Sequence, residues 1–118
     1  MYTKLALLID GEWIEETNSG SETVLNPATE QPLGTLPHAG TAELDRALAA
    51  ASRAFESWKR TSPYERGQIL RRAADLMRQR LDHIATVLTL EEGKTFAEAK
   101  GEISAAAEFF TPWNSGGD

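Results

Sequence analysis

The chain has 118 residues, a net charge of −6 and a hydrophobic content of 41%, values typical of one small, folded and soluble domain. Its lysines and arginines are spread along the sequence instead of forming a basic stripe, so neither nucleic acid nor an anionic membrane is an expected partner. It contains no cysteine, which excludes disulfides, thiolate metal sites and cysteine nucleophiles within this sequence.

The first residues do not resemble a signal peptide. An apolar run of five residues, 5–9, ends at Asp10 without a small-residue cleavage site. No stretch approaches the roughly 20 apolar residues that a membrane span requires. We therefore expect a cytoplasmic chain with no membrane partner.

The first forty residues predict β-structure. Leu7–Ile9 and Glu12–Glu15 flank Asp10–Gly11, a pair that supplies the positive φ angles of a two-residue hairpin turn. Two further strands are expected at Thr23–Leu25 and Leu33–Leu36. Residues 1–40 are therefore expected to form β-hairpins.

The apolar pattern changes to a helical period at Thr41, which we expect to cap a first helix. A second helix is expected to begin at Ser62, because Ser62 and Glu65 form a capping box and Pro63 suits the first helical position. The apolar faces of these two helices, each expected to cover a core, are Leu44, Ala47, Leu48, Ala51, Phe55 and Trp58, then Ile69, Leu70, Ala73, Leu76, Met77 and Leu81.

Two more helices are expected before residue 111. Asp82 can cap the third, and Gly93 fits the left-handed position that ends it. Thr95 and Glu98 repeat the capping box at the start of the fourth. The buried faces are expected to be Ile84, Val87, Leu88 and Leu90, then Phe96, Ile103, Ala106, Ala107 and Phe110.

This order of elements predicts an α+β fold or the opening piece of a larger protein. We expect one partial domain over residues 1–118, with hairpins in 1–40 and about four amphipathic helices in 41–110. Thr111–Pro112 should end the last helix, because a proline disfavours helical geometry in the residue before it. Residues 111–118 are expected to form a frayed tail.

Candidate sites for chemistry fail on their spacing. Gly93-Lys94-Thr95 is the ending of a phosphate-binding loop, but the first glycine of such a loop would fall at Leu88, so a plain helix–turn–helix joint is expected. No Gly-x-Gly-x-x-Gly is present. Adjacent Glu91 and Glu92 point about 100° apart on a helix and predict a solvated face.

The remaining chemical side chains also favour structural roles. His38 and His83 lie far apart in the sequence, without a partner at metal-ligand spacing. The aromatic residues predict core packing more than a ligand pocket, except for Trp113 in the tail; they are Trp13, Phe55, Trp58, Phe96 and Phe110. We assign no catalytic, cofactor-binding or metal-binding residue to this chain.

Several strings, in order, resemble the start of the aldehyde dehydrogenase superfamily. Leu8–Trp13 is similar to its "INGEW" turn, Asn26–Thr29 to its "NPATGE" hairpin, and Leu90–Thr95 to its "LEQGKP" turn. Trp58–Leu76 matches its W-x4-P/A-x-E-R-x2-I-L-R-x2-A-D-L pattern, and Ala97–Ile103 resembles the "AEAKGEI" of succinate-semialdehyde dehydrogenases. The resemblance extends over roughly residues 5 to 110.

The resemblance implies the first part of an α/β, Rossmann-like fold without its cofactor sheet. It also implies NAD- or NADP-dependent oxidation of an aldehyde to a carboxylic acid, with succinate semialdehyde as the indicated substrate. In that family the catalytic and cofactor-binding residues lie downstream of this segment, which packs on the cofactor domain. The resemblance ends at 111–114, where only Trp113 keeps register, and this suggests a truncated, frame-shifted or partial gene product.

Two functions remain open. The chain is the N-terminal fragment of such a dehydrogenase, inactive alone, whose partner is the remainder of the dehydrogenase or a second copy. Alternatively, it is a stand-alone helical interaction module that associates with itself or with a full-length dehydrogenase. Under the first hypothesis the helices present apolar faces to a sheet outside this sequence, and the isolated chain should be marginally stable.

Overall fold

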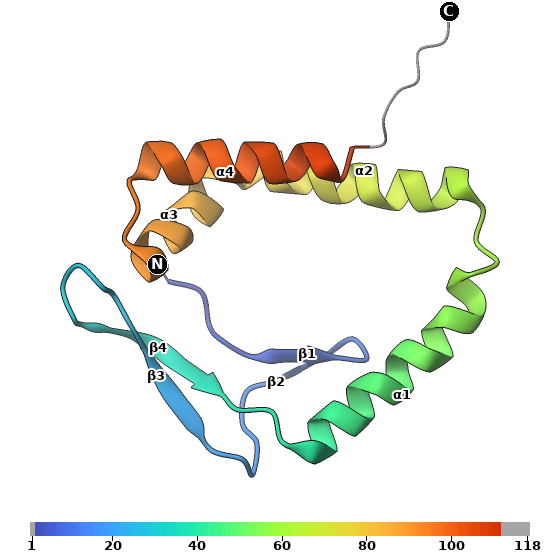
Figure 1. The fold of residues 1–118 in the computed structure, drawn as a ribbon, viewed down its shortest axis with the longest axis horizontal. Helices are drawn as coiled ribbons and strands as arrows, with labels where there is room; N and C mark the ends of the chain where they lie inside the picture. The colour runs from blue at the N-terminus through green and yellow to red at the C-terminus, as the bar shows by residue number, and fades with distance from the viewer. Residues whose placement is uncertain (1, 112–118) are drawn as a thin grey trace, which may run out of the picture. The chain divides into compact units, whose positions relative to one another are not determined.

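A computed structural model of the chain describes residues 2–111, which divide between Arg60 and Thr61 into two compact units. The first unit holds two β-hairpins and helix α1, and the second holds helices α2, α3 and α4 (Figure 1). The predicted α+β fold, with hairpins followed by helices, is confirmed. The single partial domain over 1–118 stays a prediction, and of the tail expected over residues 111–118, residues 112–118 lie outside the described residues.

The first hairpin forms where the sequence predicts it. Strand β1 (Leu7–Ile9) pairs antiparallel with strand β2 (Glu12–Ile14), and Leu8 lies opposite Trp13. The φ angles of Asp10 and Gly11 are 56° and 80°. Positive φ at both central residues is the requirement of the two-residue hairpin turn that Asp-Gly favours.

The second hairpin joins strand β3 (Ser21–Leu25) to strand β4 (Pro32–Pro37), and both strands are longer than predicted. The side chain of Asn26 organises the connection, since its Oδ1 accepts a hydrogen bond from the backbone N–H of Ala28 at 2.9 Å. The Asn26 carbonyl also accepts the N–H of Glu30 at 2.7 Å. An asparagine that bonds to the backbone two residues on is a standard way to start a turn.

Helix α1 (Thr41–Trp58) begins one residue earlier than the capping prediction requires. Gly40 is the N-cap, and its N–H donates to the carboxylate of Glu43 at 2.8 Å. The expectation that Thr41 caps this helix is therefore wrong, because Thr41 is already its first helical residue. The Glu43 carboxylate satisfies the N–H of the cap residue itself, whereas a capping threonine would have accepted an N–H from the first helical turn.

Helices α2 (Pro63–Gln79) and α4 (Phe96–Phe109) begin with the predicted capping boxes. At α2, Ser62 Oγ accepts the Glu65 N–H at 3.2 Å, and the Glu65 carboxylate accepts the Ser62 N–H at 3.1 Å. Thr95 and Glu98 repeat this exchange at α4, at 3.3 and 3.2 Å. The hydroxyl and N–H of the capping residue lower the pKa of Glu65 and of Glu98 below its ordinary value.

Helix α3 (Leu81–Glu92) follows α2 after Arg80, so the expected cap at Asp82 is wrong. Asp82 lies in the first helical turn, and its carboxylate pairs with Lys100 of α4 at 2.7 Å. The C-terminal prediction is confirmed. Gly93 has φ 81°, and its N–H donates to the Thr89 carbonyl at 2.9 Å.

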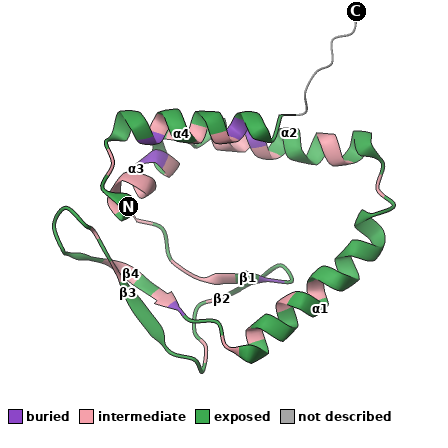
Figure 2. Cartoon of the chain, viewed as in Figure 1, coloured by how far each residue is buried: buried purple, intermediate pink, exposed green. Residues whose placement is uncertain are grey.

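Alanines fill the interior of the second unit. Among the described residues of this unit the buried side chains are small, and they come from α2, α3 and α4: Ala74, Ala85, Ala99 and Ala107 (Figure 2). In the first unit the buried residues are Ile9 and Pro37. Small side chains let helices approach closely, but they remove little apolar surface from water.

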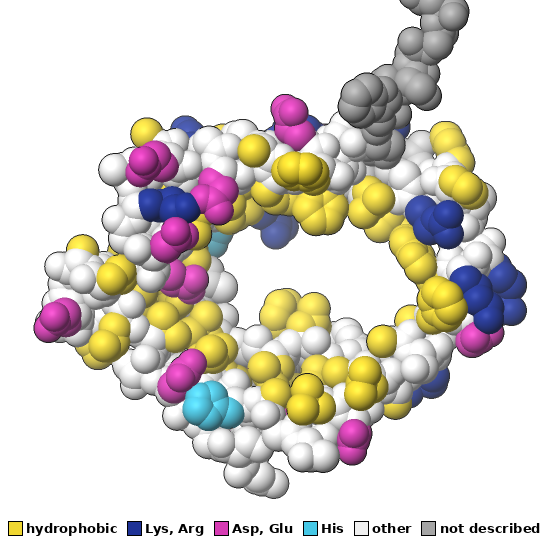
Figure 3. Space-filling model, in the orientation of Figure 1, with side chains coloured by type: hydrophobic (Ala, Val, Ile, Leu, Met, Phe, Trp, Pro, Cys, Tyr) yellow, Lys and Arg dark blue, Asp and Glu magenta, His cyan; other side chains and the backbone are white. Residues whose placement is uncertain are grey.

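Many large apolar side chains are exposed instead. Helix α1 has no buried residue, so its apolar face does not cover a core within this chain. The prediction of core packing is wrong for all five aromatic residues, whose exposures are 69% for Trp13, 58% for Phe55, 40% for Trp58, 43% for Phe96 and 40% for Phe110. Figure 3 shows such apolar groups in yellow on the surface of the molecule.

The capping residues can be tested by substitution. Ser62→Ala and Thr95→Ala should each lower the free energy of unfolding by about 1 kcal/mol, because each leaves a helix N-terminus without its side-chain acceptor. Ser104→Ala is the matched control, since the Ser104 hydroxyl bonds only back to the Lys100 carbonyl within α4. Denaturation followed by circular dichroism measures the differences, and equal losses in all three variants would contradict this assignment.

The capping carboxylates also predict a pH dependence. A carboxyl group whose pKa is lowered in the folded state stabilises that state above its unfolded value, near 4.5, and this contribution is lost as the pH falls through the lowered value. Helix content should therefore decline on acidification below pH 4.5. In Glu65→Gln/Glu98→Gln this part of the decline should be absent, and an acid titration identical to that of the parent would refute the assignment.

Candidate functional site

The turn Gly93-Lys94-Thr95 is a helix–helix joint, as predicted, and not a phosphate-binding loop. Gly93 ends α3 and Thr95 caps α4, so the residues on both sides of Lys94 have structural roles. The Lys94 ammonium contacts the carboxylate of Glu102 and lies 3.1 Å from that of Glu92. The hydrogen bond to Glu102, and then that to Glu92, raise the pKa of Lys94.

This lysine is the best shielded partner in an ion pair between described residues, with 21% of its side chain exposed. Its two carboxylate neighbours already neutralise its charge. A phosphate group would meet two anions here, and the backbone offers one glycine where a phosphate cradle needs several. The joint therefore fits neither a phosphate nor the pyrophosphate of a dinucleotide.

The two histidines and the glutamate pair show no catalytic arrangement. His38 Nε2 lies 3.5 Å from the Glu22 carboxylate, across the second hairpin. His83 lies in the first turn of α3, in the other unit. Glu91 and Glu92 are both exposed, as predicted for a solvated helix face. Among residues 2–111, no group of three or more side chains is placed to hold a metal ion.

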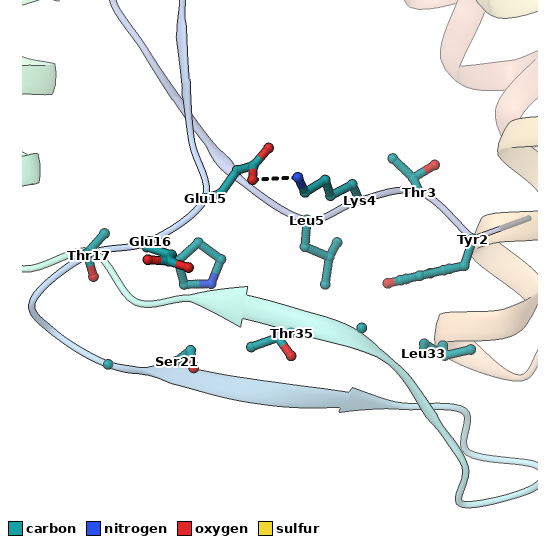
Figure 4. A pocket seen from close by; sticks show the side chains of 13 residues that line it. Tyr2, Thr3, Lys4, Leu5, Glu15, Glu16, Thr17, Ser21, Leu33 and Thr35 are labelled. Carbon is teal, nitrogen blue, oxygen red and sulfur yellow. Dashed lines mark ion pairs between the residues drawn. The ribbon is translucent and has the colours of Figure 1, made fainter.

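The first unit contains an open hollow that the sequence did not predict (Figure 4). The N-terminal segment and the second hairpin form its sides, with Tyr2 over Gly34, and Lys4 pairs with Glu15 at 2.5 Å along its edge. This ion pair already engages Lys4, the one lysine among the lining residues. The lining offers no acid–base pair or activated nucleophile, and no sequence motif marked these residues.

Each of the two units also exposes large apolar side chains. Large hydrophobic side chains are exposed on α1, α2 and α4 and on the first hairpin, and such surface in water is typical of an interface. None of the described helices combines the length and apolarity that crossing a bilayer requires.

Comparison with known proteins identifies relatives of this chain. The model of the aldehyde dehydrogenase family matches residues 13–115. Glutarate-semialdehyde dehydrogenase of Pseudomonas putida is 46% identical over 101 residues, and the NADP-dependent succinate-semialdehyde dehydrogenase of Escherichia coli is 45% identical over 102. Each match covers 86% of this chain and 21% of the relative.

Solved structures agree. An NADP-dependent enzyme of E. coli superposes with a TM-score of 0.87 at 43% identity, over 92% of this chain and 22% of that one. Succinate-semialdehyde dehydrogenase of Burkholderia pseudomallei gives a TM-score of 0.85 at 44% identity, over 89% and 22%.

The chain thus spans about a fifth of the length of the curated relatives it matches, and the matched part is their N-terminal portion. The order of motifs in the sequence, the fold of the elements and the match over residues 13–115 agree with one another. This chain belongs to the aldehyde dehydrogenase family, as its N-terminal segment.

Proposed function

We propose that this chain serves as the N-terminal packing segment of an NAD- or NADP-dependent semialdehyde dehydrogenase and is inactive alone. The observation that supports this most is the family match over residues 13–115 in a chain that spans a fifth of its relatives. The exposed apolar helices supply the physical reason, because they offer surface for the remainder of a dehydrogenase to cover.

The chemistry of the family explains why activity is assigned to the whole protein. Oxidation of an aldehyde by this route needs a thiolate to attack the carbonyl carbon and a nicotinamide cofactor to accept the hydride. This sequence has no cysteine, and its one Gly-Lys-Thr turn does not fit the cofactor's phosphates. No catalytic step is therefore assigned to a side chain of this chain.

The names of the relatives support a substrate class for the complete enzyme. Two of those most similar to this chain are named for glutarate semialdehyde and succinate semialdehyde, which both carry an aldehyde at one end and a carboxylate at the other. A short dicarboxylic semialdehyde is therefore the substrate class that we propose for the complete enzyme. Its products would be the dicarboxylic acid and the reduced cofactor.

A chimera tests this function. Residues 5–110 of this chain should replace the corresponding segment of the E. coli succinate-semialdehyde dehydrogenase and leave an enzyme that reduces NADP in the presence of succinate semialdehyde. The isolated chain should show no such reduction with NAD or NADP, since it lacks the nucleophile.

The unmodified E. coli enzyme is the positive control. Cofactor reduction by the isolated chain would contradict the proposal directly. A chimera that folds, as judged by circular dichroism and cooperative melting, but remains inactive would also count against it.

A further inference from the structure

The turn between β1 and β2 contains a dipeptide with a chemistry of its own. Asp10-Gly11 is the one place in this sequence where a glycine follows an aspartate or an asparagine. A glycine in second position has no Cβ to hinder the approach of its main-chain nitrogen to the preceding side chain. Both residues are exposed, and no described atom beyond the adjacent residues lies within 4 Å of the position that a Cβ on Gly11 would take. The turn is therefore open to water.

The reaction available to this pair converts aspartate to isoaspartate. The Gly11 nitrogen attacks Cγ of the protonated Asp10 carboxyl group, an N–Cγ bond forms, and the proton of the nitrogen leaves with the carboxyl OH as one water molecule. The product is a five-membered succinimide ring. Water then adds to one of the two ring carbonyls and breaks the bond from that carbon to nitrogen. Addition at Cγ restores aspartate, whereas addition at the main-chain carbonyl leaves a chain that runs through Cγ, with mass and charge unchanged.

Two features of the structure hold Asp10 away from this reaction. Its φ of 56° places it in the left-handed region, where Cβ lies nearly opposite the next nitrogen about the Cα–C bond. Ring closure needs these two atoms on the same side, so the turn must open first. The Arg53 guanidinium of α1 also lies 2.7 Å from Asp10 Oδ2, and this contact must break before Cγ can turn towards Gly11. Helix α1 therefore acts directly on the reactive carboxyl group.

We propose that Asp10 is a site of spontaneous isomerisation to isoaspartate and that its ion pair with Arg53 restrains the reaction. The site lies within the first unit and is independent of the packing role in a dehydrogenase. Arg46 joins the same helix to the same hairpin, but its partner is the carboxylate of Glu12. Arg46 therefore offers a matched control for a direct effect of Arg53 on Asp10.

Isomerisation would remove both structural roles of Asp10. The chain gains one main-chain carbon inside a two-residue turn, and the register that sets Leu8 opposite Trp13 depends on the length of that turn. The remaining carboxylate is attached directly to Cα, so it is one carbon shorter and loses its reach to Arg53. The modified hairpin should therefore lose both its register and its contact with α1.

The rate of isomerisation can be measured in a short peptide. Cleavage after Glu12 releases residues 1–12, in which Asp10 is the only aspartate or asparagine. Reversed-phase chromatography separates the isoaspartyl form, and electron-transfer fragmentation identifies it. At neutral pH, isomerisation should be fastest in the chain unfolded in guanidinium chloride and slower in the folded chain. Arg53→Ala should raise the folded rate about threefold, because an exposed ion pair shifts an equilibrium by a small factor, and Arg46→Ala should raise it less.

Further variants separate a direct effect of Arg53 from a general loss of structure. Arg53→Lys keeps a cation at this position and should stay close to the parent rate, even if circular dichroism shows that Arg53→Ala loses helix content. Asp10→Glu keeps a carboxylate but cannot close a five-membered ring, so its thermal stability should survive storage that lowers that of the parent. Equal rates in Arg53→Ala and Arg46→Ala would overturn the proposal. Equal rates in the folded and unfolded parent, or no isoaspartate in either, would overturn it as well.

Discussion

The small size of the buried side chains limits how much hydrophobic stabilisation this chain gains from its own packing. Among the described residues of the second unit, the fully buried side chains are alanines on α2, α3 and α4, the leucines are half-buried or exposed, and the aromatic residues are exposed. A methyl-sized group contributes roughly 0.8 kcal/mol when buried, against roughly 2 kcal/mol or more for a whole Leu or Phe side chain. The chain therefore brings its helices together without gaining most of the hydrophobic stabilisation that its sequence offers, and that gain depends on a partner surface.

Local interactions define the elements independently of any partner. Capping boxes at Ser62 and Thr95, the left-handed Gly93 and the Asp10–Gly11 turn each satisfy backbone groups within a few residues. Ion pairs then connect neighbours inside each unit, as between Arg53 and Asp10 or between Lys100 and Asp82. A segment built this way can form its helices and hairpins first and bury its apolar faces later.

The contrast between local interactions and the burial of apolar faces explains what the sequence could predict. Capping and turn chemistry are local, so the element order and most boundaries were predictable. The error at Thr41 arose because α1 begins one residue earlier, where the Glu43 carboxylate accepts the N–H of Gly40. The error at Asp82 arose because α3 follows directly after Arg80, which places Asp82 inside the first helical turn. Periodicity identified the apolar face of each helix. It could not reveal what covers that face, so Phe55 and Trp58 were expected in a core and are exposed. No signal marked the hollow beside Tyr2, because its lining residues come from four separate segments.

The central claim is that this chain exposes the apolar surface on which its stability should depend, and the free energy of unfolding of the isolated chain tests it most directly. Denaturant unfolding at low protein concentration, where copies are separated, should show a broad transition with a free energy of unfolding below about 5 kcal/mol. This free energy should increase as the protein concentration rises. A sharp, concentration-independent transition well above 5 kcal/mol would show that the chain stabilises itself and would contradict the account.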